Sequence, residues 1–105
     1  MITLKPETAE LIKSEMESIP ERYQKPFNST HEGYAVLLEE VREIEHVVFF
    51  GEKEAKNEMF TRFSQTTKVG SDEVRSMATQ LHKDRLREEA VQIAAMAARI
   101  IQELT

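Results

Sequence analysis

One segment near the end of the chain limits what this sequence can fold into. Residues Ala90–Ile101 form a run that is rich in alanine and apolar on almost every side of a helix. Such a helix has to be covered over most of its surface, and its small side chains let a neighbouring helix approach closely. The segment therefore predicts a fold in which helices pack against helices.

The composition agrees with an all-α fold. The 105 residues include 3 Gly and 3 Pro, whereas a β-sandwich or barrel needs frequent turn-forming residues. Apolar residues make up 40% of the chain, which is too many for a disordered tail. We expect a single domain over residues 1–105, with three to four helices in a bundle that dimerisation completes, because so small a domain has a thin core.

Local signals place the first two helices. Pro6 suits the first turn of a helix that extends to about Pro20. Ser29 followed by Glu32 matches a capping box, in which the serine hydroxyl and the acidic side chain satisfy the free backbone N–H groups at a helix start. A second helix is therefore expected over about residues 30–50.

The second half of the chain is expected to hold one or two more helices. Gly51 is a plausible stop for the second helix, and a third helix is expected within residues 52–65. A last helix is expected to be capped by Ser71 or Asp72 and to reach Leu104, with an irregularity near residues 82–84. The main apolar stripe of the second helix is expected to face the core and consists of Tyr34, Leu37, Leu38, Val41, Ile44 and Val48.

Charge and cysteine content exclude several classes of function. The net charge is −5, and the 14 basic residues are too scattered to follow the phosphate backbone of a nucleic acid. No apolar run approaches the length of a membrane span. The lack of cysteine rules out thiolate metal sites and fits a reducing compartment. We expect a cytoplasmic protein that binds neither a nucleic acid polymer nor a membrane.

Two acidic spacings carry most of the chemical information. Glu40 and Glu43 are three residues apart, so they lie on one face of the second helix, one turn from each other. Glu89 and Gln92 repeat this spacing in the last helix, where they form part of a polar line through an otherwise apolar segment. Carboxylates that meet between two helices repel one another unless a divalent cation neutralises them.

The chemistry of these residues favours a hard cation. Oxygen ligands without cysteine suit Mg²⁺ or Mn²⁺, and such a metal held by carboxylates indicates phosphate chemistry. Spacing alone nevertheless favours a solvated acidic face, because helices rich in glutamate contain such pairs by chance. A pair between Glu89 and Arg85, with Gln92 satisfying a backbone group, would account for the same polar line.

Both acidic pairs lie in stretches with a recognisable pattern. The stretches read STHEGYAVLLEEVREI over residues 29–44 and REEAVQIAAMAAR over residues 87–99, together about a third of the chain. They resemble the MazG-like group of all-α nucleoside triphosphate pyrophosphohydrolases, and most closely the short versions found in phages and prophages. In that family an E-x-x-E helix pairs with an E-x-x-D helix and binds Mg²⁺.

The resemblance implies an activity and a set of site residues. The family hydrolyses a (d)NTP to a (d)NMP and pyrophosphate, with water activated by a carboxylate-bound metal, in helical dimers or tetramers. Glu40, Glu43 and Glu89 would then be catalytic metal ligands for Mg²⁺ or Mn²⁺, with Gln92 assisting. The implied partners are a nucleoside triphosphate and further copies of the chain in a homodimer or homotetramer.

This sequence departs from the family pattern at two points. Gln92 stands where the family has an aspartate, so it offers a neutral oxygen in place of a charge, and Glu39 or Glu88 could fill in. The distance between the two motifs is longer than usual, which makes residues 52–84 look like an insertion.

Two further residues are candidates for substrate binding. Arg99 is the best-placed basic residue of the last helix and could meet a phosphate, or it could pair with Glu89 or Glu103. His31, in the first turn of the second helix, could also contact a phosphate, although a solvated histidine is the simpler interpretation. The alternative to an enzyme is a helical assembly module or a nucleotide-binding regulator that has lost its active site.

Overall fold

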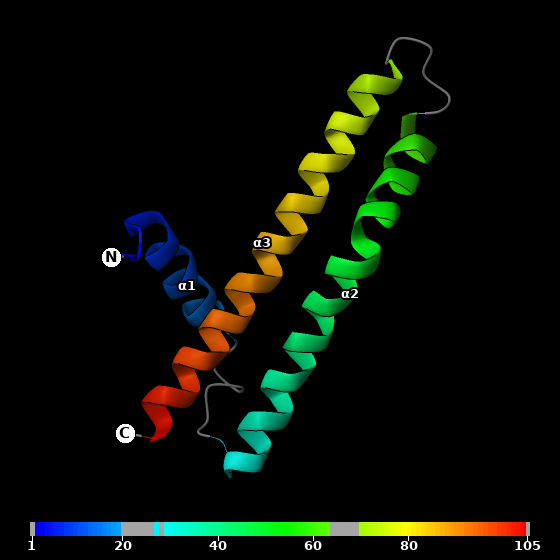
Figure 1. Cartoon of the computed structure of the whole chain (residues 1–105). Coiled ribbons are helices and arrows are strands. Elements are labelled where there is room, and N and C mark those ends of the chain that lie inside the picture. Colours follow the sequence, from blue (N-terminus) through cyan, green and yellow to red (C-terminus); the bar gives the residue numbers. More distant parts are fainter. Residues whose placement is uncertain (1, 20–26, 28, 64–69, 105) are drawn as a thin grey trace. The chain divides into compact units, whose positions relative to one another are not determined.

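The computed structural model describes residues 2–19, 27, 29–63 and 70–104, and over these residues the chain is all-α, as expected (Figure 1). Three helices follow one another: α1 (Pro6–Ser18), α2 (Thr30–Phe63) and α3 (Ser71–Leu104). Within the described residues there is no strand. None of these helices combines the length and the apolar character that crossing a membrane requires.

The helix starts follow the sequence signals. Pro6 occupies the first turn of α1, with Glu7 near the positive end of the helix. At the start of α2 the Ser29 hydroxyl oxygen accepts a hydrogen bond from the backbone N–H of Glu32 at 3.2 Å, which is the serine half of the expected capping box. The last helix begins at Ser71, one residue earlier than a cap at Ser71 would give.

Gly51 does not end α2, so that expectation was wrong. The helix continues through Gly51 to Phe63 and absorbs the separate helix expected within residues 52–65, of which residues 64 and 65 lie outside the described chain. Gly51 is buried, and a methyl group there would lie 3.0 Å from Nδ1 of His82. The missing side chain allows α3 to approach α2 closely, and glycine costs a helix interior only about 1 kcal/mol relative to alanine.

The expected irregularity near residues 82–84 is also absent. Helix α3 is uninterrupted from Ser71 to Leu104. His82 lies in this helix, and its Nδ1 atom is buried without a hydrogen-bond partner among the described residues. The His82 side chain therefore packs against Gly51, and it does not interrupt the helix.

The chain forms two compact units, and the first contains the candidate site residues Glu40, Glu89 and Gln92. This first unit comprises Met1–Val41 and Glu89–Thr105, which includes α1, the start of α2 and the end of α3. Inside it, α2 and α3 run antiparallel: Gly33 lies beside Ile100, whereas Glu40, later in α2, lies beside Gln92, earlier in α3.

The apolar segment Ala90–Ile101 is less covered than expected within one chain. Ala95 is buried, residues 91–94 and 96–100 are half-buried, and both ends of the segment are exposed. Within the first unit, α1 and α2 cover only part of the surface of this segment. One copy of the protein therefore buries this segment less than its apolar character predicts.

The second unit, Arg42–Glu88, has a small apolar cluster of its own. Ala55, Met59, Val74 and Ala78 are its buried members among the described residues. Arg85 donates a hydrogen bond to Glu58 across this unit. That hydrogen bond lowers the pKa of the Glu58 carboxyl, so the ion pair persists at neutral pH.

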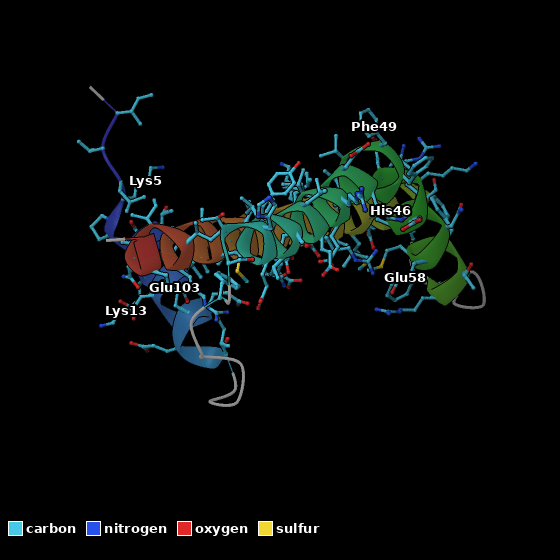
Figure 2. All side chains as sticks on the ribbon, turned by 90° about the horizontal axis from the view of Figure 1, so that it is seen from below. Lys5, Lys13, His46, Phe49, Glu58 and Glu103 are labelled. Atoms are coloured by element: carbon cyan, nitrogen blue, oxygen red, sulfur yellow. The ribbon has the colours of Figure 1, made fainter. Side chains whose placement is uncertain are left out.

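The predicted apolar stripe of α2 is split between packed and exposed positions. Leu37 and Ile44 are half-buried, as a core-facing stripe requires. Tyr34 and Val41 are exposed by 64% and 39%. Phe49, further along α2, also projects outward and is 71% exposed (Figure 2). One copy of the chain therefore leaves a considerable apolar surface on α2 in contact with water.

The contact between Gly51 and His82 gives a test of the helix pairing. We expect Gly51→Ala to destabilise the protein by about 1 kcal/mol, because overpacking against the imidazole outweighs the better helix propensity of alanine. In a His82→Ala background the same change should instead stabilise by up to about 1 kcal/mol. Urea unfolding of the four proteins measures the coupling, and equal effects of Gly51→Ala in both backgrounds would contradict this packing.

Candidate metal centre

Two carboxylates from different helices of the first unit lie close together, and a third follows one turn along the same helix. Glu40 and Glu43 occupy successive turns of α2, and Glu89 belongs to α3. A carboxylate oxygen of Glu40 lies within 4.8 Å of one of Glu89, both in the first unit, and Glu43 follows Glu40 one turn along α2. Helix α2 is uninterrupted between Glu40 and Glu43, so the helix itself fixes the distance between these two residues. Glu40 and Glu89 are half-buried and Glu43 is exposed.

Such a cluster is electrostatically unfavourable without a counter-charge. Two like charges about 4 Å apart repel by about 1 kcal/mol in water and by about 4 kcal/mol at the effective dielectric constant of a protein surface. Half-burial of Glu40 and Glu89 moves the cluster toward the second value. A divalent cation with carboxylate ligands would remove this repulsion, and the donor set of oxygens suits Mg²⁺ or Mn²⁺.

Gln92 lies between the two half-buried carboxylates. In one orientation its amide nitrogen donates hydrogen bonds to Oε2 of Glu40 at 3.0 Å and to Oε2 of Glu89 at 3.3 Å. Rotation of the amide by 180° presents the carbonyl oxygen to the same position. Gln92 can therefore hold the carboxylates together through its N–H groups or add an oxygen ligand to a cation.

A cavity of about 310 Å³ adjoins this cluster. It is lined by Glu40 of α2, by Gln92, Ala95 and Met96 of α3, and by Glu15 and Ile19. Glu15 belongs to α1 and was not among the residues predicted to support the site. The expected substitutes for the missing aspartate, Glu39 and Glu88, are both exposed. Glu15 escaped prediction because nothing in its local spacing relates α1 to the other two helices.

Arg99 lies further along α3, next to a second cavity. Its Nε atom donates to Oε1 of Glu103 at 3.0 Å, which confirms one of the two pairings expected for it. The guanidinium also lies over the Phe27 ring, 4.2 Å from the ring centre. The cavity, of about 230 Å³, is lined by Met16, Ile19, Arg99, Gln102 and Glu103. Arg99 is seven residues from Gln92, about 10 Å along the helix axis.

His31 is not part of the carboxylate cluster. It is exposed in the first turn of α2, nine residues before Glu40 and about 14 Å from it along the helix axis. A substrate would have to span this distance to contact both residues.

No family model, no curated protein and no solved structure matches this chain. The link to the MazG-like group therefore remains a resemblance carried by the two motif stretches.

The cluster predicts a stabilising effect of divalent cations. Saturating Mg²⁺ or Mn²⁺ should raise the melting temperature by about 4 °C or more, because a ligand that binds only the folded protein stabilises it. Glu40→Gln should abolish this rise, since it removes one of the charged oxygen ligands of the cation.

Glu39→Gln is the matched control, because it removes the same charge from the exposed neighbouring position of α2. Gln92→Asp should enlarge the metal-dependent rise by restoring a fourth charge. An unchanged melting temperature of the original protein at millimolar Mg²⁺ and Mn²⁺, or equal losses in the Glu40 and Glu39 variants, would argue against a metal centre here.

Proposed function

We propose that the protein is a Mg²⁺-dependent nucleoside triphosphate pyrophosphohydrolase similar to the MazG-like group. The observation that carries this proposal is the convergence of Glu40 and Glu89, whose oxygens lie within 4.8 Å of one another in the first unit, with Glu43 one turn further along α2. These are the residues at which the sequence resembles the family's acidic motifs. The proposed reaction cleaves a (d)NTP between the α and β phosphates and yields a (d)NMP and pyrophosphate.

The three carboxylates would hold the cation, and the amide oxygen of Gln92 would complete the set. A bound Mg²⁺ or Mn²⁺ would neutralise phosphate oxygens and lower the pKa of a water molecule. Gln92 would first have to turn its nitrogen away from Glu40 and Glu89, which breaks two hydrogen bonds. We therefore expect weaker metal binding than an aspartate at this position would give.

Substrate binding is assigned to Arg99 and His31. Arg99 presents a permanent positive charge beside the cavity that it lines together with Met16 and Ile19. His31 lies at the positive end of α2, where an anionic group is favoured. These assignments follow from charge and position on the two helices that supply the carboxylates.

The alternative function is a non-catalytic module for helical assembly or nucleotide-dependent regulation. It is favoured by Gln92, which replaces the acidic residue of the family motif, and by the large apolar surface of α2. A regulator would be stabilised by nucleotide without turnover, whereas a pure assembly module would respond to neither nucleotide nor metal.

The enzymatic proposal is tested by direct assay. The purified protein should release pyrophosphate from at least one member of a (d)NTP panel in the presence of Mg²⁺ or Mn²⁺. Glu40→Gln and Glu89→Gln should each lower kcat/KM by about a hundredfold or more, since each removes charge stabilisation of the reacting phosphates. Glu39→Gln should retain full activity, and a protein that releases pyrophosphate from no nucleotide would refute the enzymatic assignment.

We further propose that the protein acts in the cytoplasm as a homodimer or homotetramer. Tyr34 and Val41 are seven residues apart on α2, and both are exposed apolar side chains. Two helical turns separate them, so they form one strip that a second copy of the chain would cover.

A charge placed in this strip should dissociate the assembly. Val41→Lys should yield monomers in sedimentation velocity, because burying an unpaired ammonium is costly. Glu39→Lys introduces the same side chain about 200° around the helix and should leave the assembly intact. A monomeric original protein, or the same association in all three proteins, would contradict this interface.

A further inference from the structure

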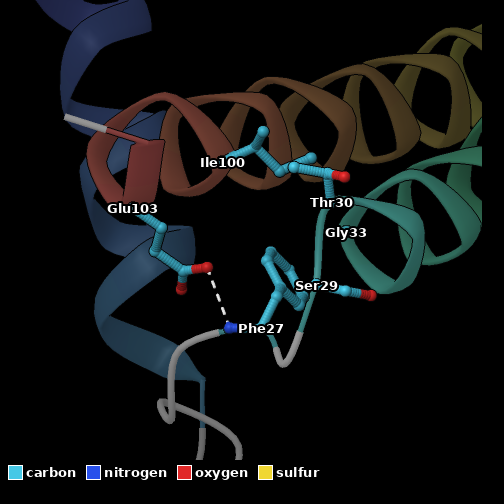
Figure 3. A pocket seen from close by; sticks show the side chains of 6 residues that line it. All are labelled: Phe27, Ser29, Thr30, Gly33, Ile100 and Glu103. Carbon is cyan, nitrogen blue, oxygen red and sulfur yellow. Dashed lines mark hydrogen bonds between the residues drawn. The ribbon is translucent and has the colours of Figure 1, made fainter.

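A third cavity lies at the start of α2, inside the first unit. It has a volume of about 260 Å³ and is lined by Phe27, Ser29, Thr30, Gly33, Ile100 and Glu103. Figure 3 shows the Phe27 ring below Ile100, with the Glu103 carboxylate on one side and Ser29 on the other. The cavity therefore combines an apolar floor with hydroxyl and carboxylate groups at its edge.

The walls of this cavity are held in place by specific contacts. The backbone N–H of Phe27 donates to Oε2 of Glu103 at 3.0 Å (Figure 3). The Arg99 guanidinium lies over the Phe27 ring. Gly33 has no side chain, and a methyl group there would lie 3.2 Å from Cδ2 of Phe27. The position of the Phe27 ring thus depends on the glycine, and these contacts hold the ring in place without a ligand.

Size and polarity limit what can bind. Cavities that enclose drug-sized molecules measure about 300–1,000 Å³, so this one suits a single ring system rather than a whole nucleotide. Among the described residues, the carboxylate of Glu103 accepts one hydrogen bond at each oxygen, from Arg99 and Phe27, and a carboxylate has about four acceptor positions. The Ser29 oxygen accepts from Glu32, while its own hydrogen can be donated.

The cavity lies on the same side of the two helices as the carboxylate cluster. Gly33 and Glu40 are seven residues apart, which is about two turns and about 10 Å along α2. Ile100 and Gln92 are about 12 Å apart along α3. Glu103 also lines the Arg99 cavity. A ligand with phosphates at the carboxylates would place its other end here.

We propose that this cavity binds the base of the nucleotide and selects bases with an amino group, guanine above all. Guanine presents two neighbouring N–H donors to a carboxylate and a carbonyl oxygen to a hydroxyl. Uracil and thymine place their single N–H between two carbonyl groups, which Glu103 would repel. The inference rests on the proposed function for the triphosphate, and it adds the identity of the base.

Two variants and one control test the proposal. Ile100→Phe fills the cavity, whereas Ile101→Phe adds the same ring at a neighbouring residue that is 63% exposed. Glu103→Gln replaces one acceptor oxygen by a donor. The measurements are KM and kcat for GTP and UTP with Mg²⁺, together with calorimetric binding of guanosine and uridine without metal.

We expect the original protein to prefer GTP over UTP about tenfold or more in kcat/KM, the value of one hydrogen bond to a charged group. Glu103→Gln should bring this ratio close to one, and Ile100→Phe should raise KM for GTP about tenfold while Ile101→Phe does not. Turnover with no base preference, or unchanged constants in Ile100→Phe and Glu103→Gln, would overturn the base site and leave the proposed function intact.

The nucleoside titration separates the two proposals. If no nucleotide is hydrolysed, but guanosine binds and Ile100→Phe abolishes that binding, the proposed function fails and the base site stands. If neither nucleotide turnover nor guanosine binding is found, both are overturned.

Discussion

Antiparallel packing of α2 against α3 in the first unit determines where every candidate functional residue of that unit lies. Gly33 faces Ile100 at one point of this contact, and Glu40 faces Gln92 at another. Because each helix rises about 1.5 Å per residue, fixing one such pair fixes the others along the same contact. The carboxylate cluster and the cavity at the start of α2 are therefore two parts of one helix pairing, and a shift in its register would displace both.

Because Gln92 is neutral, the cluster has less electrostatic repulsion than four carboxylates would have. With its nitrogen toward Glu40 and Glu89, the amide offsets part of their mutual repulsion by hydrogen bonding. The same amide must turn before its oxygen can meet a cation. The hydrogen bonds of Gln92 thus stabilise the metal-free protein and weaken its affinity for a cation. Because the proposed hydrolysis needs that cation, glutamine in place of the family's aspartate is expected to lower the activity.

Local signals predicted much of the fold and little of its packing. The cap at Ser29 and the start of α3 near Ser71 were readable because they depend on neighbouring residues alone. Gly51 was misread because a helix stop and a close helix contact both call for glycine, and only the position of His82 distinguishes them. Helical spacing paired Glu40 with Glu43, but the place of Glu15 beside Glu40 depends on the packing of α1, which no pattern in the sequence specifies.

The proposed activity requires a cation held jointly by α2 and α3. Electron paramagnetic resonance of Mn²⁺ added to the purified protein measures this directly, because binding broadens the six-line signal of the free ion. We predict that the original protein and Glu39→Gln remove the free signal at micromolar Mn²⁺, and that Glu40→Gln and Glu89→Gln do not. A free signal that persists at every ratio of protein to Mn²⁺, or that is removed equally well by all four proteins, would contradict the proposed centre.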